Sequence, residues 1–286
     1  MVRRAECAKR TAALSLFALV CVAVTARAGR VIEVPSAEAQ TISHAFIKTK
    51  PGDTVLVEPG VYRERVFVEA GTVLKARDRL EAVIDGKGKG TVVTLGRNSS
   101  ISGFVVRNGT IGVFSKHSGN AITWCRIVRN WQTGIICVRH LPSVEDNVIA
   151  FNGASGIQGW DVRSVGPSIL HNTIAYNSNH GVAMGGKSNL MIEYNIIAHN
   201  ERFHVKLLPE SDKVRMVNNN FYRNLWSPSP LPTGNFAYDP RFMAPRTRLD
   251  FTSAGKVACP ECPEDESPGI RVNTYEDVGS SGGGRL

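Results

Sequence analysis

The stretch NTIAYNSNHGV, residues 172–182, decides the fold because the chain repeats it. Near copies are NVIAFNGASGI at residues 147–157 and NIIAHNERFHV at residues 195–205. Aligning the second asparagine of each phrase gives a column with steps of 22, 22, 25, 23 and 24 residues: Asn108, Asn130, Asn152, Asn177, Asn200 and Asn224. A period of this length indicates a solenoid, in which each repeat packs only on its neighbours.

The repeats are built from short β-branched segments that glycine and asparagine interrupt, which is typical of strands. A coil of three short strands and three turns fits about 23 residues, and parallel coils stack about 4.8 Å apart. Stacking places equal positions above one another, so asparagines can form ladders. We predict one ladder at Asn147, Asn172, Asn195 and Asn219, with Cys125 in the equivalent place of the preceding coil.

The part before the repeats predicts a cap for the stack. AQTISHAFIKTKPGD, residues 39–53, carries a Thr or Ser before a short apolar run that ends before Pro51. We expect a short helix there, which would cover the open end of the coils and their unpaired strand groups.

These phrases resemble a known superfamily. KPGDTVLVEPGVYRERV at residues 50–66, AVIDG at 82–86 and the NxIxxNxxxGI phrases resemble the right-handed parallel β-helix superfamily of pectin-lyase-like proteins. YDPRFMAP at residues 238–245 resembles the Asp-Pro-x-Phe segment that follows the coils in bacterial members. The resemblance covers about residues 30–250 and implies an all-β, single-stranded right-handed parallel β-helix. It implies no single activity, because the superfamily includes lyases, hydrolases, esterases, epimerases and non-catalytic members.

The domain organisation predicted from composition has three parts. Residues 1–28 read as a signal peptide, with a basic start, an apolar run and an ARA site at Ala26–Ala28. Residues 29–258 form the β-helix, and residues 259–286 form a disordered tail rich in Pro, Glu, Ser and Gly. We therefore expect a secreted or periplasmic monomer without stable membrane insertion. Cys259 and Cys262 in the tail favour a local disulfide or a free pair over a metal site.

The net charge favours an acidic polymer as partner and is no nucleic-acid footprint. The whole chain carries +9. The signal peptide contributes five cations and one acid, which leaves 9 − 4 = +5: Arg3, Arg4, Lys9, Arg10 and Arg27 against Glu6. A mildly basic exported solenoid suits an acidic polysaccharide.

One face of the coils gathers the candidate binding residues. Side chains alternate inward and outward along the strand that follows each Gly, so outward positions form rows. An exposed Trp160 beside cations would stack on sugar rings while the cations meet carboxylates. The alternative, that Trp160 packs beneath the enlarged loop at residues 161–168, stays open. The predicted substrate-binding residues are Trp160, Gln158, Asp161, Lys116, His117 and Lys187.

The acid content of this face bears on the reaction class. Glycoside hydrolysis wants two facing carboxylates, and this face offers Asp161 alone. A calcium-dependent lyase wants a carboxylate cluster, which is also missing. A metal-free lyase remains, in which Lys206 takes the proton next to a uronate and Arg202 or Arg139 stabilises the developing charge. The candidate catalytic residues are Lys206, Arg139, Arg202, His180 and His204, and we expect no metal and no cofactor.

Each of these cations is also compatible with an ordinary solvated surface, so three hypotheses remain. The first is recognition of an acidic polysaccharide, with β-elimination as a further activity. The second is a non-catalytic solenoid that binds a cell wall or matrix. The third is a periplasmic accessory protein for metalloenzyme maturation.

Overall fold

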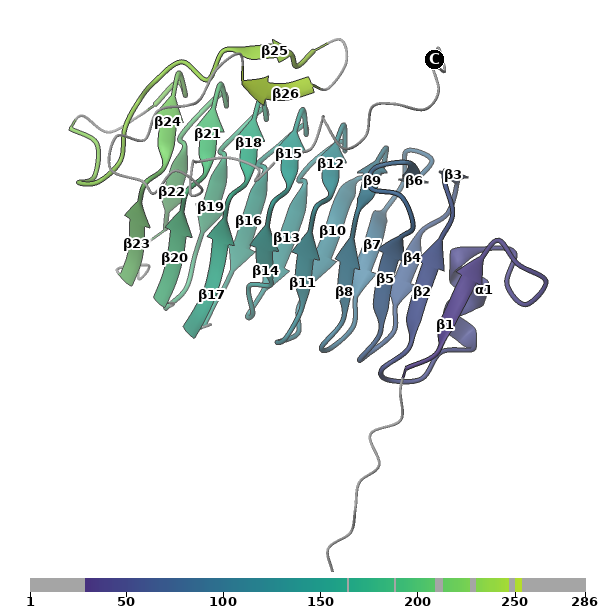
Figure 1. Ribbon diagram of the computed structural model, residues 1–286. Coiled ribbons are helices and arrows are strands. Elements are labelled where there is room, and N and C mark those ends of the chain that lie inside the picture. The colour runs from purple at the N-terminus through teal and green to yellow at the C-terminus, as the bar shows by residue number, and fades with distance from the viewer. Residues whose placement is uncertain are drawn as a thin grey trace, which may run out of the picture.

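The computed structural model describes residues 29–253, except 164, 188, 209–212, 227–229 and 247–249. The chain winds into one right-handed stack of about eight coils, each made of three short strands (Figure 1). This confirms the predicted all-β parallel solenoid. The predicted signal peptide, the predicted tail and the pair Cys259 and Cys262 lie outside the described residues.

Three parallel sheets form the walls of the stack, and each coil visits them in the order A, B, C. Sheet A contains β1 (Val31–Val34), β2 (Thr54–Val57), β5 (Val73–Ala76), β8 (Ser100–Ser102), β11 (Ala121–Thr123), β14 (Ser143–Glu145), β17 (Val165–Leu170), β20 (Asn189–Glu193) and β23 (Lys213–Val217). Sheet B contains β3 (Gly60–Tyr62), β6 (Ala82–Asp85), β9 (Phe104–Arg107), β12 (Arg126–Val128), β15 (Val148–Ala150), β18 (Thr173–Ala175), β21 (Ile196–Ala198) and β24 (Asn220–Tyr222). Sheet C contains β4 (Val66–Val68), β7 (Thr91–Leu95), β10 (Ile111–Ser115), β13 (Ile135–Val138), β16 (Ile157–Trp160), β19 (Val182–Met184) and β22 (Val205–Leu207).

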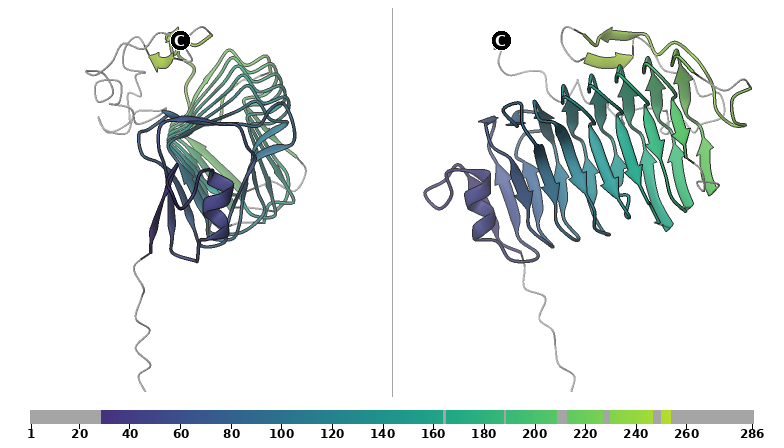
Figure 2. Two further views of the ribbon diagram at one scale, coloured as in Figure 1. Left: turned by 90° about the vertical axis from the view of Figure 1, so that its right-hand side faces the viewer. Right: turned by 180° about the vertical axis from the view of Figure 1, so that it is seen from behind.

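A short helix, α1 (Ile42–Ile47), lies across the N-terminal end of the stack, as predicted (Figure 2). Thr41 is its N-cap, because its side chain accepts a hydrogen bond from the backbone N–H of His44. The carboxylate of Glu64 accepts from the N–H groups of Ile42 and Ser43, at 3.0 and 2.9 Å. These bonds fix the helix where the first coil would otherwise expose its interior.

Buried asparagines form two ladders rather than the single one predicted. In the first, each Oδ1 accepts both the backbone N–H and the Nδ2–H of the asparagine one coil earlier; Asn172 accepts from Asn147 at 3.0 Å in both bonds. This ladder turns the corner between sheets A and B, and it runs through Asn147, Asn172, Asn195, Asn219 and Asn235. The second begins the loop between sheets B and C, and it runs through Asn130, Asn152, Asn177, Asn200 and Asn224.

The residue before each ladder position has a left-handed backbone. At the A–B corner these residues are Trp124, Asp146, His171, Tyr194 and Asn218, with φ between 54° and 57°. At the B–C corner they are Asn108, Arg129, Phe151, Tyr176, His199 and Arg223, with φ between 47° and 56°. A left-handed non-glycine residue costs roughly 1–2 kcal/mol. The ladder bonds offset that cost because they satisfy backbone N–H groups that the sharp corner would leave unpaired.

Asn108 is the exception to the predicted column. Its backbone has the left-handed φ of 55°, so it stands one place before the ladder. Gly109 takes the ladder place and donates its N–H to Oδ1 of Asn130 at 3.1 Å. The side chain of Asn108 instead donates to Asp85 at 2.8 Å.

The interior is filled in columns that follow the coils. Gly112, Gly134, Gly156 and Gly181 leave no room for a side chain, because a Cβ would come within 2.8 Å of an isoleucine Cγ2 in the next coil. At the last such position stands His204, which is buried. Phe221 replaces the isoleucine there, and the imidazole stacks on its ring at 4.1 Å. The sequence predicted His204 as a candidate catalytic residue on the outer face, and its burial in the coil corrects this.

The segment after the coils packs on the outer face of sheet B in the last coils, where Ala175, Ile196 and Ala198 are buried in clusters that include Phe242. Asn220 exchanges two 2.9 Å hydrogen bonds with the backbone of Tyr238. β25 (Phe242–Ala244) pairs antiparallel with β26 (Asp250–Ser253), and Figure 1 shows this hairpin above sheet B. The ring of Phe242 lies 6.3 Å from that of Tyr176. The described part of this segment packs on sheet B and leaves the outer faces of sheets A and C open, and the candidate residues named from the sequence belong to sheet C and the loops at its strand ends.

Replacing a ladder asparagine should lower the free energy of unfolding. Asn172→Ala removes the acceptor for Asn147 and leaves the carbonyls of Val144 and Leu170 without their donor. Buried groups left unpaired predict a loss of about 3 kcal/mol or more. Urea unfolding followed by circular dichroism measures it, with half-buried Asn179→Ala as control. An equal, small loss in both variants would contradict a structural role for the ladder.

His204 should make the fold acid-labile. Burial lowers its pKa from 6.5 to about 4. Its contribution is therefore complete above pH 6.5 and is lost as the pH falls toward 4, by about 3 kcal/mol at most. His204→Leu should keep its unfolding free energy better than the parent between pH 7 and pH 4. Parallel pH curves for the two proteins would refute this assignment.

Candidate functional site

The outer face of sheet C carries the residues that the repeat places in rows. The register pairs Ile136 with Gln158, Gln158 with Ala183 and Ala183 with Lys206. The second row pairs Val138 with Trp160. The predicted inward and outward rows are therefore confirmed.

Trp160 ends β16 and is 48% exposed. This exposure agrees with the alternative in which the ring is open to solvent.

The turns from sheet C to sheet A form a basic rim beside Trp160. Successive coils contribute cations here because the turns stack with the strands. The basic rim consists of Arg97, Lys116, His117, Arg139, His140, Arg163 and Lys187, together with Asp161.

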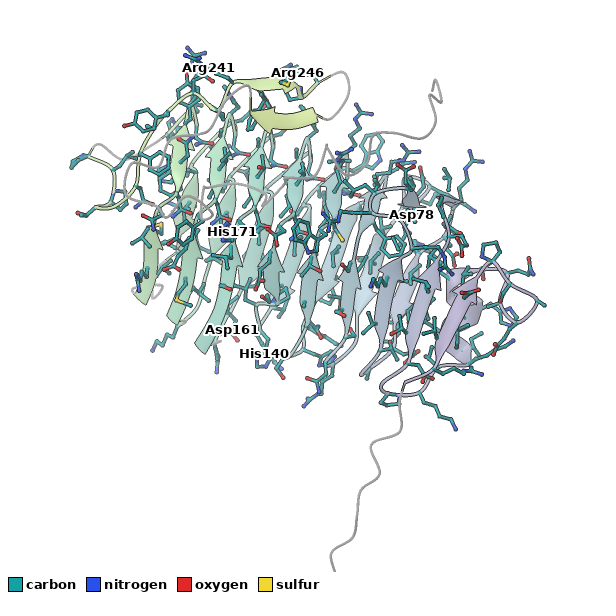
Figure 3. All side chains as sticks on the ribbon, viewed as in Figure 1. Asp78, His140, Asp161, His171, Arg241 and Arg246 are labelled. Carbon is teal, nitrogen blue, oxygen red and sulfur yellow. The ribbon has the colours of Figure 1, made fainter. Side chains whose placement is uncertain are left out.

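Four residues of the basic rim line a surface cavity of about 280 Å³: Arg139, His140, Asp161 and Arg163. Figure 3 shows His140 and Asp161 at the same edge of the molecule. The N–H of Arg163 donates to the carbonyl of Arg139 at 2.9 Å, and its guanidinium pairs with Asp161 at 2.9 Å. One carboxylate therefore faces two guanidinium groups and an imidazole, so the cavity suits an anion.

The histidine of the neighbouring coil is neutral at pH 7. Burial lowers the pKa of His117, and the charges of Lys116, Arg97 and His140 lower it further. That three neighbouring cationic side chains lower this pKa shows that positive charge is dense along the basic rim. A neutral imidazole there donates or accepts hydrogen bonds without adding to the repulsion.

A second group lies at the other end of the sheet C strands, in the last coils. This end cluster consists of His180, Arg202, Phe203, Lys206 and Trp226. The rings of His180 and Phe203 are 5.6 Å apart, and those of Phe203 and Trp226 are 5.2 Å apart. The Lys206 ammonium lies 4.9 Å from the Phe203 ring, and the Arg202 guanidinium lies 5.6 Å from the Trp226 ring.

His180 is poorly suited to be a base. Its pKa is lowered by burial and by the charges of Arg202 and Lys206, so it is neutral at pH 7. Its Nδ1 accepts the backbone N–H of Phe203 at 3.3 Å, which leaves the proton on Nε2. In this tautomer the free nitrogen donates a hydrogen bond.

The five predicted catalytic residues do not form one constellation. Lys206, Arg202 and His180 belong to the end cluster, and His204 is buried inside the coil. Arg139 follows β13, three coils from the strand of Lys206, which is about 14 Å along the stack. Arg139 therefore acts on a different part of any ligand.

The structure also adds residues to the predicted set. His140 and Arg163 complete the cavity, and Trp226 completes the end cluster. The repeat held a signal for Trp226: it stands 24 residues after Arg202, the same step as Asn200 to Asn224. His140 and Arg163 carried no such signal, because the C–A turns vary in length.

Two further observations concern metals and membranes. Among the residues that the structure describes, no three His, Cys, Asp or Glu side chains gather as a metal site would need. The same part of the chain contains no helix that is long and apolar enough to cross a membrane.

Comparisons with known proteins agree with this architecture. A family model described as right-handed β-helix region matches residues 112–227. A comparison with curated proteins found no match. The solved structure of pectate lyase Pel9A is 15% identical with a TM-score of 0.57, over 73% of this chain and 75% of its own. A pectin methylesterase in complex with a hexasaccharide is 11% identical with a TM-score of 0.38, over 81% of this chain and 98% of its own.

At these identities the similarity concerns the fold and not the activity. The family match falls on the coils that carry both asparagine ladders. The chain therefore has the right-handed parallel β-helix fold that its repeats predict, and pectate lyase Pel9A shares this fold.

Proposed function

We propose that sheet C and its basic rim bind an acidic polysaccharide. The observation that carries this proposal is the cavity of Arg139, His140, Asp161 and Arg163 beside the exposed ring of Trp160. Guanidinium groups pair with carboxylates or sulfates through two parallel hydrogen bonds. An indole offers a flat apolar surface for the C–H face of a sugar ring.

The row of cations extends the site beyond one sugar. Lys116 and His117 lie on one side of the cavity and Lys187 on the other, in neighbouring coils. Coils repeat about every 4.8 Å, which is comparable to the length of one sugar residue in an extended chain. Gln158 lies within β16, two residues before Trp160, and would hydrogen-bond sugar hydroxyls. The fold neighbour of highest similarity given above is named for an acidic polysaccharide, which supports the choice of ligand.

A second candidate function is β-elimination at the end cluster. Lys206 and Arg202 both lie close enough to His180 to influence its charge, so base and charge stabiliser share one place. Lys206 would take the C5 proton of a uronate, and the electron pair would form the C4–C5 double bond as the C4–O bond breaks. Arg202 would stabilise the enolate-like charge, and the leaving oxygen would take a proton from water.

Export and a monomeric state complete the proposal. Export through residues 1–28 would place the protein outside the cytoplasm, where we expect it to act as a monomer. A non-catalytic solenoid would use the same surface without the elimination step. A role in metalloenzyme maturation has no donor cluster to rest on within the described residues.

Variants of the cavity test the binding proposal. Trp160→Ala and Arg139→Gln should each weaken binding to polygalacturonate about tenfold, because each removes one stacking or charge-paired contact. Isothermal titration at two salt concentrations measures this, and the affinity of the parent should fall as salt rises. Lys75→Gln on sheet A and Tyr238→Ala are matched controls outside the site. Unchanged affinity in both cavity variants would exclude this surface as the binding site.

The ultraviolet absorbance of unsaturated uronate tests the elimination step. If the end cluster is catalytic, Lys206→Ala should lower kcat by on the order of 10²-fold or more. Arg139→Gln should change KM rather than kcat, because Arg139 lies three coils away. Full activity of Lys206→Ala would exclude Lys206 as the catalytic base. Polymer binding without any absorbance from unsaturated uronate would favour the non-catalytic solenoid.

A further inference from the structure

The most exposed large aromatic side chain among the described residues lies outside the site above. Trp131 is 70% exposed, against 48% for Trp160 and for Trp226. It stands in the loop between β12 and β13, at the opposite end of the sheet C strands from the basic rim. Four strand residues separate the two ends by roughly 13 Å or more, so one sugar ring cannot contact both indoles.

The backbone beneath Trp131 is held in place, and it is built from glycine. The N–H of Trp131 donates to the carbonyl of Gly109 at 2.8 Å. Its indole nitrogen lies near Gly88, in the coil before that of Gly109. A Cβ on Gly88 would lie 3.8 Å from this nitrogen. Gly88 has a φ of +75°, and its N–H donates to the carbonyl of Asn108 at 2.6 Å. The side chain of Trp131 therefore reaches back over the glycines of two earlier coils, and it stays open to solvent.

Exposed cations stand in the loops next to Trp131. Lys87 and Lys89 are exposed in the same glycine-rich loop, and the Arg65 guanidinium lies against Gly90, with Nη1 2.6 Å from the place of a Cβ. Arg129 is exposed two residues before Trp131. In the described part of the chain none of these four cations has an ion pair with an acid.

The nearby carboxylate is already occupied. Asp85 accepts from the N–H of Lys87 at 3.0 Å, from Asn108 at 2.8 Å and from Arg107 at 3.2 Å. These bonds lower its pKa against the effect of its burial. Asp85 thus fixes the loop and leaves the ammonium groups of Lys87 and Lys89 available to an external anion.

We infer that Trp131 with Lys87, Lys89 and Arg65 is a second contact site for an anionic polysaccharide. A sugar ring stacks on the indole, and a neighbouring carboxylate or sulfate meets the lysines. The ligand class rests on the proposed function, but the residues and the location are independent of it. One long chain that touches this site and the basic rim would gain affinity through the second, intramolecular contact.

Binding of long and short ligands by the same variants tests the inference. Trp131→Ala, and separately Lys87→Gln with Lys89→Gln, should weaken binding of long polygalacturonate by on the order of tenfold or more. Both should leave the affinity of a trigalacturonate for the basic rim unchanged. Trp131→Phe should retain most of the affinity, because it keeps a stacking ring. Uncharged dextran should bind neither parent nor variant. Lys50→Gln with Lys75→Gln is the charge-matched control, and thermal unfolding confirms that each variant is folded.

The outcomes separate this site from the basic rim. Normal polymer binding by Trp131→Ala, with a loss in Trp160→Ala, would overturn the second site and keep the proposed function. A loss in Trp131→Ala with no change in Trp160→Ala would keep the second site and overturn the role of the rim. Equal loss in the lysine variant and its charge-matched control would show non-specific attraction and overturn the inference as well.

Discussion

The structure depends on the pairing of a left-handed residue with a buried asparagine, which recurs at two corners of the coils from Asn130 onward. The left-handed residue turns the chain sharply, and the asparagine after it satisfies the groups that the turn exposes. Asn177, for example, accepts two hydrogen bonds from Asn152 and donates to the carbonyl of Ile149. Each asparagine needs its neighbour in the next coil, so the ladder stabilises the stack and not the single coil.

This constraint also fixes the surface. A slip of one residue would turn every side chain of a strand to the other face. The ladders exclude such a slip, so equal positions of successive coils lie above one another on sheet C. The step of 25 residues from Asn152 to Asn177 shows that the register of the coils tolerates a longer turn. The extra residues fall after Trp160, β17 absorbs them in a register shift between Val165 and Ser168, and the ladder from Asn152 to Asn177 continues at 3.1 Å. Turns can therefore change to build a site while the coils keep their register.

Features that follow from the repeat period can be predicted from the sequence. Features that depend on the ends of the stack or on the paths of the turns cannot. The rows of sheet C and the first ladder follow from spacing alone. Asn108 was misplaced because Gly109 takes the ladder position without an asparagine to mark it. His204 was predicted as a candidate catalytic residue on the outer face because the pattern gives its position but not the ring of Phe221, which accommodates it. The cavity required the paths of the turns, since Arg139 and Arg163 meet through a backbone hydrogen bond that no repeat encodes.

Under the proposed function, the distribution of charge would make binding a general property of sheet C and cleavage a local one. The basic rim runs over successive coils, and the acid that lines its cavity, Asp161, is paired with Arg163. Such a row would meet many anionic groups of one polymer, each weakly because the side chains are exposed. Chemistry on one bond needs its groups within a few ångströms. In this surface the end cluster comes nearest to that condition, where Lys206 and Arg202 surround a neutral imidazole. If sheet C binds the proposed polymer, a β-helix of this kind could therefore lose or gain a reaction at one end while the binding wall remains intact.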